Sequence, residues 1–250
     1  MLAPLRGPVD RARKHPESGP MSPHDLTTIR TRFARAIAAH EPSLRLYAIL
    51  DRETCARRNL DIRDVAVAWL GAGVRLVQYR DKLAGDDDLL RNARDLRAIF
   101  PRDEAFLILN DRPDLVEACD FDGAHIGQTD QEVQQARDLL GPQRLLGVST
   151  HSADQALLQR NSDVDYVAIG PVFATSTKAD ADPVVGLCGV QAARAVMPGP
   201  LVAIGGIGLG DARAVEMAGA DSVAVISALL PGSDLDGVTG RAQDFLARLK

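Results

Sequence analysis

Polar and charged side chains that could do chemistry follow several short apolar runs in this chain. Gln78, Arg80 and Lys82 alternate after one such run, and at a spacing of two they would point the same way from an extended segment. A planar guanidinium and a compact ammonium beside an amide are suited to binding a diphosphate. A solvated strand end has the same residue types, so the spacing alone does not decide between these two interpretations.

Carboxylates follow the next two apolar runs. Asp111, next to Asn110, comes after the first of these runs, and Asp130 comes shortly after the second. If neighbouring strand ends converge, both carboxylates could face one Mg²⁺, which prefers one or two carboxylates together with water and substrate phosphates. The alternatives are that Asp130 caps the helix after it and that Asp111 pairs with Arg112.

A serine and two histidines stand near these carboxylates in the sequence. The hydroxyl of Ser149 would contact a substrate or cap the following helix, and His151 is expected at the start of that helix rather than as a general acid–base. His125 lies inside a predicted strand, where packing or hydrogen bonding is more typical than metal ligation. The chain has no Gly-x-Ser-x-Gly motif, which argues against a serine hydrolase.

Two later loops have the composition of anion sites. Thr175, Thr177 and Lys178 place two hydroxyls and a cation on one loop, which suits a leaving diphosphate or a ring substituent. A glycine-rich turn containing Gly206 follows the seventh predicted strand, and Ile226-Ser227 follow the eighth. Barrel enzymes commonly bind phosphate there with backbone N–H groups, and glycine lets the backbone approach the oxygens.

The elements that would position these residues alternate regularly between strand and helix. The apolar strands show little inside–outside alternation, which is typical of a parallel sheet buried on both faces. Strands are expected at residues 44–50, 74–78, 106–109, 123–126, 145–148, 166–169, 201–204 and 222–226. Helices are expected at residues 60–71, 87–100, 113–118, 131–140, 153–160, 189–196, 212–218 and 238–249. Eight strand–helix units in a chain of this length predict a single (β/α)8 TIM barrel of the α/β class, whose active sites lie at the carboxyl ends of the strands.

Length and composition agree with one barrel domain. Residues 1–22 are rich in proline and basic residues and are expected to be a disordered extension, while residues 23–250 form the domain, with the barrel proper from about residue 44. An extra helix is expected at about residues 25–39, capped by Ser22 or Asp25. The net charge of −5 argues against a general nucleic-acid binder. Widely spaced cysteines and the lack of a long apolar segment predict a cytoplasmic protein with free thiols and no membrane partner.

Taken in order, seven segments closely resemble the thiamine phosphate synthase family, over roughly residues 44–230. Any one of them is modest evidence, but all seven in the same order are highly specific. The segments are Gln78-x-Arg80-x-Lys82, Asn110-Asp111-Arg112, Asp122-Gly123-x-His125-x-Gly127-Gln128-x-Asp130, Gly147-x-Ser149-x-His151, Gly170-Pro171-Val172-Phe173-x-Thr175-x-Thr177-Lys178, Gly205-Gly206-Ile207 and Ile226-Ser227.

The resemblance implies a reaction and assigns a role to each site residue. The family couples 4-amino-2-methyl-5-hydroxymethylpyrimidine diphosphate to a thiazole phosphate and releases diphosphate by a dissociative, Mg²⁺-dependent mechanism. The resemblance implies that Mg²⁺ is bound by Asp111 and Asp130, and that Ser149 and Lys178 lie near the reacting centre as catalytic residues. It implies that the pyrimidine diphosphate is held by Gln78, Arg80, Lys82 and Asn110, with a further contact from Lys178. It implies that the thiazole phosphate is held by Thr175, Thr177, Gly206, Ile226 and Ser227.

Two other functions fit parts of the same pattern. A thiazole tautomerase is a related barrel that binds thiazole phosphate without coupling it, and it need not retain the diphosphate-binding cations or the metal carboxylates. A non-catalytic phosphate-binding barrel would need neither the metal nor the residues of the loop after the sixth strand. The cations and carboxylates that such proteins need not keep are all present here, which favours the synthase: they are Arg80, Lys82, Asp111, Asp130 and Lys178. The sequence leaves the oligomeric state open, including a homo-oligomer.

Overall fold

Short buried strands alternate with helices along the chain, and the strands close on themselves. In the computed structural model, which describes residues 23–128, 130–175 and 182–249, the strands β1 to β8 pair in parallel and in sequence order to form a closed barrel. Their bounds are β1 Leu46–Asp51, β2 Leu76–Arg80, β3 Phe106–Asn110, β4 Gly123–Ile126, β5 Leu145–Thr150, β6 Tyr166–Ile169, β7 Leu201–Ile204 and β8 Ser222–Val225. Pairing of β1 with β8, through Leu46 opposite Val223, closes the ring. The predicted (β/α)8 barrel is confirmed.

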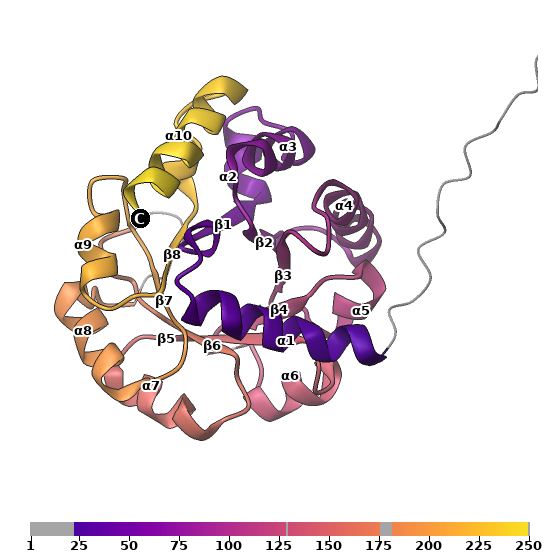
Figure 1. Cartoon of the computed structure of the whole chain (residues 1–250). Helices are drawn as coiled ribbons and strands as arrows, with labels where there is room; N and C mark the ends of the chain where they lie inside the picture. Colours follow the sequence, from indigo (N-terminus) through magenta and orange to yellow (C-terminus); the bar gives the residue numbers. More distant parts are fainter. Residues whose placement is uncertain (1–22, 129, 176–181, 250) are drawn as a thin grey trace, which may run out of the picture.

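Helices form an outer ring around the strands (Figure 1). The α-helices are α1 Pro23–Ala38, α2 Arg52–Arg57, α3 Ile62–Ala72, α4 Asp86–Ile99, α5 Val116–Cys119, α6 Val133–Leu140, α7 Ala153–Leu158, α8 Gly186–Val196, α9 Ala212–Met217 and α10 Leu235–Arg248. Short 3-10 helices are η1 Pro42–Leu44, η2 Pro113–Leu115, η3 Gln159–Asn161 and η4 Ser227–Leu229. Within the described ranges, no helix combines the length and the apolar character that crossing a bilayer requires.

Two apolar clusters fill the space on either side of the barrel wall. The larger cluster lies between the strands and the outer helices and includes Trp69, Phe121 and Phe245. The smaller fills the barrel interior with residues such as Tyr47 and Tyr166. Because both faces of each strand are buried, the strands appear in the sequence as continuous apolar runs.

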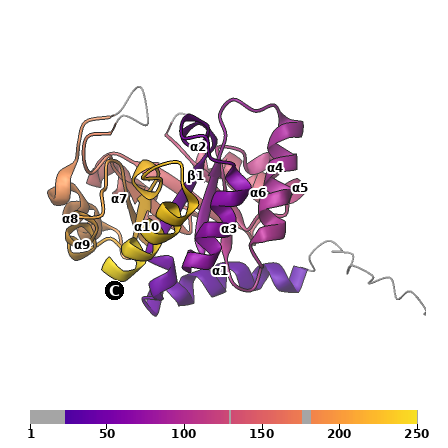
Figure 2. The ribbon, with the colours of Figure 1, turned by 90° about the horizontal axis from the view of Figure 1, so that it is seen from above.

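Helix α1 lies across the amino end of the barrel, beneath the strands in Figure 2. Ile29, Phe33 and Ile37 lie on one face at helical spacing and pack against the interior cluster. The ring of Phe33 meets the ring of Phe106 edge to face, with centroids 5.4 Å apart. Burying each of these side chains is worth about 1.5–3 kcal/mol. The expected N-terminal helix is present, and it closes the end of the barrel opposite the predicted site. Residues 1–22 lie outside the described residues.

Several element boundaries differ from those expected, and β2 shows why. The strand was expected at residues 74–78 but runs over Leu76–Arg80. The N–H of Val74 is already used at the end of α3, where it donates to the carbonyl of Trp69 beyond Gly73, which has a φ of +100°. The left-handed conformation of Gly73 at this helix ending keeps Val74 out of the strand. At its other end the strand extends to Arg80, which pairs with Asp51 of β1. Helix α2 was not expected, because six residues are too few to show a helical period.

Candidate active site

The predicted site residues that the structure describes gather at the carboxyl end of the barrel. Gln78 is the middle residue of β2 and Arg80 its last, Asn110 ends β3, and Ser149 lies near the end of β5. Asp111 follows β3 directly, and the turn containing Asp130 follows β4. Thr177 and Lys178 lie outside the described residues, so their positions stay predictions.

Arg80 is paired with a carboxylate that the sequence analysis did not select. It lies opposite Asp51 in the pairing of β1 with β2, and its guanidinium forms a hydrogen-bonded ion pair with that side chain. Asp51 also accepts hydrogen bonds from the backbone N–H and the hydroxyl of Thr54, at 2.8 and 2.6 Å, and so caps α2. The Asp51-x-x-Thr54 spacing after an apolar run was the available signal for this cap. Because a guanidinium has five N–H donors in a rigid plane, this pairing orients Arg80 and leaves donors for a phosphate.

Lys82, Asp111 and Asp130 form one charged cluster. Lys82 Nζ lies 3.1 Å from an Asp111 carboxylate oxygen, and the Asp130 carboxyl interacts with that of Asp111. Asp130 also accepts a 2.6 Å hydrogen bond from the backbone N–H of Gly127. Partial burial of its carboxyl, followed by the contact with Asp111, raises the pKa of Asp130. Two carboxyls in contact favour a shared proton or a cation between them.

The backbone at Asp111 is held in an uncommon conformation. Its φ is +59°, in the left-handed region that few residues other than glycine adopt, and its N–H donates to the carbonyl of His125 at 2.8 Å. That bond ties the end of β3 to β4 and turns the carboxylate toward Lys82 and Asp130. Strained backbone of this kind clusters at functional sites.

Neither alternative interpretation of the two aspartates agrees with these contacts. Arg112 pairs with Asp86 at 2.6 Å and with Asp114 at 2.8 Å instead of with Asp111. Helix α6 begins at Val133 after Glu132, so Asp130 is not its cap. Neither carboxylate is therefore used by Arg112 or by the cap of α6.

The donor set fits a hard divalent cation. Two carboxylates in mutual contact, one with a raised pKa, supply the oxygen ligands that Mg²⁺ prefers. In the described part of the chain, no three His, Cys, Asp or Glu side chains come together as metal ligands. A cation at Asp111 and Asp130 would therefore take its remaining ligands from water and substrate, as Mg²⁺ commonly does.

Ser149 contacts a histidine instead of capping a helix. Its hydroxyl oxygen lies 2.9 Å from His125 Nε2, whereas Ser152 caps α7 through the N–H of Gln155. His125 is buried, stacked on Tyr166, and hydrogen-bonded to the Tyr166 hydroxyl at 3.1 Å. The interpretation of His125 as a hydrogen-bonded residue is confirmed. Sequence reasoning missed the Ser149–His125 contact, which joins residues on neighbouring strands.

The loop between β6 and α8 is anchored at both of its ends. Val172 and Phe173 donate to the carbonyls of Ile204 and Gly205, and Val185 donates back to the carbonyl of Pro171 at 2.8 Å. The ring of His151 was expected at the start of a helix. His151 does stand there, directly before the Ser152 cap of α7, and its backbone N–H donates to the Gln155 side chain at 2.6 Å. Its ring also bonds the carbonyl of Gly170 at 2.7 Å and lies 3.2 Å from a carboxylate oxygen of Asp182, which belong to the two ends of the β6–α8 loop. These contacts place Thr175 beside the end of β7.

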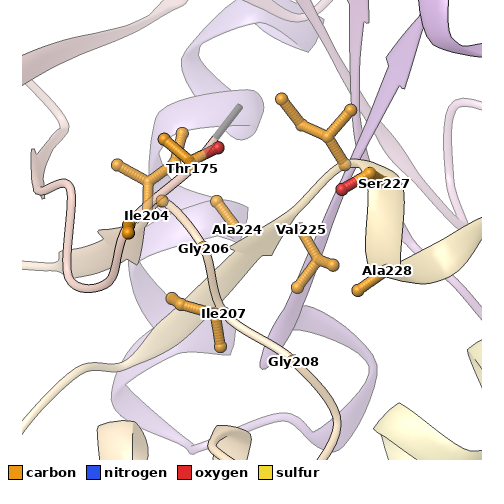
Figure 3. A pocket seen from close by; sticks show the side chains of 12 residues that line it. Thr175, Ile204, Gly206, Ile207, Gly208, Ala224, Val225, Ser227 and Ala228 are labelled. Atoms are coloured by element: carbon orange, nitrogen blue, oxygen red, sulfur yellow. The ribbon is translucent and has the colours of Figure 1, made fainter. Parts of the chain in front are cut away.

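A pocket of about 230 Å³ lies between the ends of β7 and β8. Figure 3 shows Thr175 and Ser227 on opposite sides of it, with Gly206 between them. Gly206 has a φ of +67°, and a Cβ there would lie only 2.4 Å from the carbonyl oxygen of Ala174. Only glycine fits such a position, so the backbone itself forms the wall of the pocket. The predicted phosphate residues Thr175, Gly206, Ile226 and Ser227 all line this pocket.

Comparison with known proteins agrees with this arrangement. Residues 46–229 match the family model described as thiamine monophosphate synthase, which covers most of the chain and nearly the segment that carried the resemblance. The chain belongs to the thiamine monophosphate synthase family. It is 44% identical to the thiamine-phosphate synthase of Koribacter versatilis over 188 residues, which cover 74% of this chain and 89% of the relative. It is 42% identical to that of Chloroflexus aurantiacus over 209 residues, covering 84% and 94% of the two chains.

A solved member of the family has the same fold. The chain superimposes on the thiamine phosphate pyrophosphorylase from Pyrococcus furiosus with a TM-score of 0.71 at 30% sequence identity, covering 83% of this chain and 98% of the other. Like the other members of the thiamine monophosphate synthase family, this chain is an enzyme of the transferase class that acts in thiamine biosynthesis. Helix α1 lies before the matched residues, so the element that closes the amino end of the barrel is outside the family match.

Proposed function

We propose that this enzyme couples 4-amino-2-methyl-5-hydroxymethylpyrimidine diphosphate to thiazole phosphate and releases diphosphate in a Mg²⁺-dependent reaction. The observation that carries the proposal is the division of the site into two parts. A cluster of cations and paired carboxylates lies at β2 to β4, and a glycine-walled pocket lies at β7 and β8. A site for a diphosphate beside a site for a monophosphate fits a reaction that joins two phosphorylated substrates.

The cations at β2 would hold the diphosphate. Arg80 is oriented by Asp51, and Lys82 is brought to the same cluster by Asp111. Asn110 at the end of β3 and Gln78 in the barrel interior would contact the pyrimidine diphosphate, and Lys178 would join them from the β6 loop. As negative charge builds up on the departing diphosphate, fixed cations stabilise it without reorganising.

Asp111 and Asp130 are the residues that would hold Mg²⁺. When bound, Mg²⁺ would neutralise charge on the diphosphate and so favour its departure. Asp111 is preorganised for this role by its hydrogen bond to the carbonyl of His125, and Asp130 by its bond from Gly127. Holding two carboxyls together is unfavourable when both are ionised, so a divalent cation relieves the repulsion between them.

The acceptor would bind at the other part of the site. The phosphate of the thiazole would occupy the pocket lined by Gly206, Ile226 and Ser227, with Thr175 and Thr177 as hydroxyl donors. Backbone N–H groups in such a pocket bind phosphate without a full positive charge. This position directs the thiazole ring toward the centre of the barrel mouth, where Ser149 lies.

The reaction would proceed by dissociation, and the protein would supply no nucleophile. The bond from the pyrimidine methylene to the diphosphate breaks first, and the thiazole nitrogen then attacks the methylene carbon. Ser149 and Lys178 would lie near this centre and orient the reacting groups. The loop between β6 and α8 would limit the access of water during this step.

Product formation by the purified enzyme tests the proposal. The protein is incubated with both substrates and Mg²⁺, and thiamine phosphate and diphosphate are measured by chromatography and mass spectrometry. We expect equal amounts of both products, and none when either substrate is left out or when EDTA removes the metal. Binding of thiazole phosphate without any product would contradict the proposal and favour a tautomerase or a phosphate-binding barrel.

A further inference from the structure

A buried chain of hydrogen bonds crosses the barrel interior and joins two of the proposed substrate contacts. Gln78 Nε2 donates to the Tyr47 hydroxyl at 2.9 Å, and that hydroxyl lies 2.8 Å from the hydroxyl of Tyr166. The Tyr166 hydroxyl is 3.1 Å from His125 Nδ1. His125 Nε2 is 2.9 Å from Ser149 Oγ. All five residues are buried, and they come from five different strands.

The protons in this chain follow a direction set by the Gln78 amide. Each hydroxyl has one proton to donate, and a neutral imidazole has one N–H and one acceptor nitrogen. With the amide nitrogen facing Tyr47, the Tyr47 hydroxyl accepts that bond, and its own proton has an acceptor in this chain when it is donated to Tyr166. In that arrangement Tyr166 donates to Nδ1 of His125, and a neutral ring then carries its proton on Nε2 and donates it to Ser149.

Burial keeps this sequence of donors intact. Burial away from water raises the pKa of both Tyr47 and Tyr166, so both phenols stay protonated at neutral pH. Every link then has a donor and an acceptor, which avoids the cost of an unpaired polar group in the core. In the opposite direction the Tyr47 proton would face the amide nitrogen of Gln78, which is a donor, and would have no acceptor in this chain.

We propose that Tyr47, Tyr166 and His125 are positioning residues that fix Ser149 as a hydrogen-bond donor to the substrate. Because Ser149 Oγ accepts from His125, its own proton is left for an acceptor atom of the bound substrate, a ring nitrogen or a phosphate oxygen. This inference rests on the proposed function, in which Ser149 lies at the reacting centre.

Ser149 and His125 could also be interpreted as a nucleophile and its general base, and the direction of the hydrogen bond from His125 to Ser149 argues against this. Their separation of 2.9 Å is that of a nucleophile and its base, but the group that orients His125 is the phenol of Tyr166 instead of a carboxylate. With the ring proton on Nε2, His125 cannot accept the serine proton. The pair therefore positions substrate and does not generate a nucleophile.

The tautomer of His125 tests the proposal without relying on activity. Nitrogen-15 NMR of the histidine-labelled full-length enzyme distinguishes a proton on Nε2 from one on Nδ1, and the spectrum of His125→Gln assigns the signal. We expect the Nε2–H form in the wild type and a mixture of both tautomers in Tyr166→Phe, which lacks the donor to Nδ1. The Nδ1–H form in the wild type, or an unchanged tautomer in Tyr166→Phe, would overturn the proposal.

Tyr79→Phe is a matched control, since Tyr79 is the remaining tyrosine of the chain and is also buried. Its hydroxyl bonds Asp81 at 3.0 Å and Asn92 at 3.2 Å, outside the hydrogen-bonded chain through the barrel. We expect the wild-type tautomer and turnover in Tyr79→Phe. In Tyr166→Phe we expect kcat to fall on the order of tenfold, the usual scale for losing an orienting partner, while KM for thiazole phosphate stays within about twofold.

An equal loss of kcat in both tyrosine variants would overturn the positioning role, because it would show a general effect of removing a buried hydroxyl. Failure of the wild-type enzyme to form thiamine phosphate would overturn the proposed function instead. The tautomer would still decide the direction of the hydrogen bonds in that case. The two failures are therefore distinguishable.

Discussion

The aspartates that precede strands at the amino end of the barrel and those that follow β3 and β4 at the carboxyl end have opposite kinds of partners. At the amino end, aspartates that precede strands are each satisfied by an arginine and a backbone N–H. At the carboxyl end, Asp111 and Asp130 meet as like charges, with Lys82 alongside. The amino end is also closed by α1, whereas the carboxyl end holds the glycine-walled pocket (Figures 1–3).

The amino-end contacts repeat along the described chain. Asp122 before β4 accepts from Leu107 N at 2.8 Å and pairs with Arg97 of α4 at 2.9 Å. The same geometry recurs before β6 and before β8. There the contacts are Asp165 with Leu146 N at 2.8 Å and Arg137 at 3.0 Å, and Asp221 with Leu201 N at 2.8 Å and Arg194 at 2.9 Å.

This difference separates the charges that hold the fold from those to which the proposed function assigns a ligand. A buried carboxylate with an arginine and a backbone donor has its hydrogen-bonding capacity used within the protein. A pair of carboxyls in contact has capacity to spare for a cation. Barrel enzymes generally separate the two tasks in this way, with stability at the amino face and chemistry at the carboxyl face.

The largest expected effect is the loss of activity in Asp111→Asn. Removing one of the two carboxylates should lower the rate of thiamine phosphate formation about a hundredfold at fixed Mg²⁺ and shift the Mg²⁺ titration to higher concentration. The melting temperature should change little, because the amide keeps the side chain's shape. Asp114→Asn is the control, since this exposed carboxylate of the same loop pairs with Arg112. An unchanged Mg²⁺ titration in Asp111→Asn would remove this residue from the metal site.

Asp122→Ala should destabilise the fold, because Asp122 is one of the paired aspartates at the amino end. It leaves Arg97 without its carboxylate and Leu107 N without its acceptor, both in the protein interior. The free energy of unfolding should fall by about 3–5 kcal/mol, measured by urea denaturation. Asp88→Ala removes an exposed ion pair with Arg91 and should change it by less than about 1 kcal/mol. Equal effects of the two variants would show that burial does not set the strength of the pairs at the amino end.

Gly206→Ala should damage the pocket at the carboxyl end with a smaller effect on the fold. A methyl group there would lie 2.4 Å from the carbonyl oxygen of Ala174, on a backbone with a φ of +67°. We expect KM for thiazole phosphate to rise on the order of tenfold and stability to fall by about 1–3 kcal/mol. In Gly210→Ala the new methyl would have no atom within 4 Å, so both quantities should stay near the wild-type values. A normal KM in Gly206→Ala would place the phosphate elsewhere.

The smallest expected difference between the two ends is in side-chain packing. We expect buried cysteines near both ends to be equally protected from solvent. Burial raises the pKa of Cys55, in the helix after β1, to about 12 and that of Cys119, in the helix before β4, to about 11. Their raised pKa favours the unreactive thiol at neutral pH, whereas Cys188 is exposed. Mass spectrometry after mild alkylation of the native enzyme should find the label on Cys188 alone. Rapid labelling of Cys55 would show that the carboxyl end opens more readily than the amino end.

The sequence predicted most of this fold because the parallel strands are buried on both faces. The bounds of β4, β6 and β7 were predicted to the residue, because each run is preceded by an aspartate or a proline and followed by a glycine. The start of β2 could not be predicted, because it depends on how the N–H of Val74 is used at the end of α3. The short helix α2 depends on its cap by Asp51 and has too few residues to show a period.

The candidate site likewise has residues that the sequence predicted and partners that it did not. Residues that follow strands along the chain, such as Asp111 and Asp130, were predicted together because barrel topology brings neighbouring strand ends to one place. The partners that orient them come from distant parts of the sequence, as with Asp51 for Arg80 and Tyr166 for His125. Only three-dimensional pairing shows these contacts. The arginine–aspartate pairs of the amino end did leave a signal, since an aspartate directly precedes Gly123, Tyr166 and Ser222 at the starts of their strands.

Calorimetric binding of diphosphate tests most directly whether the carboxyl-end charges form a metal–diphosphate site. Inorganic diphosphate is titrated into the wild type and into Asp111→Asn, each with Mg²⁺ and with EDTA. The account predicts that the wild type binds diphosphate tightly only when Mg²⁺ is present and that Asp111→Asn binds it at least about tenfold more weakly. Equal affinity with and without Mg²⁺, or an affinity unchanged in Asp111→Asn, would contradict it.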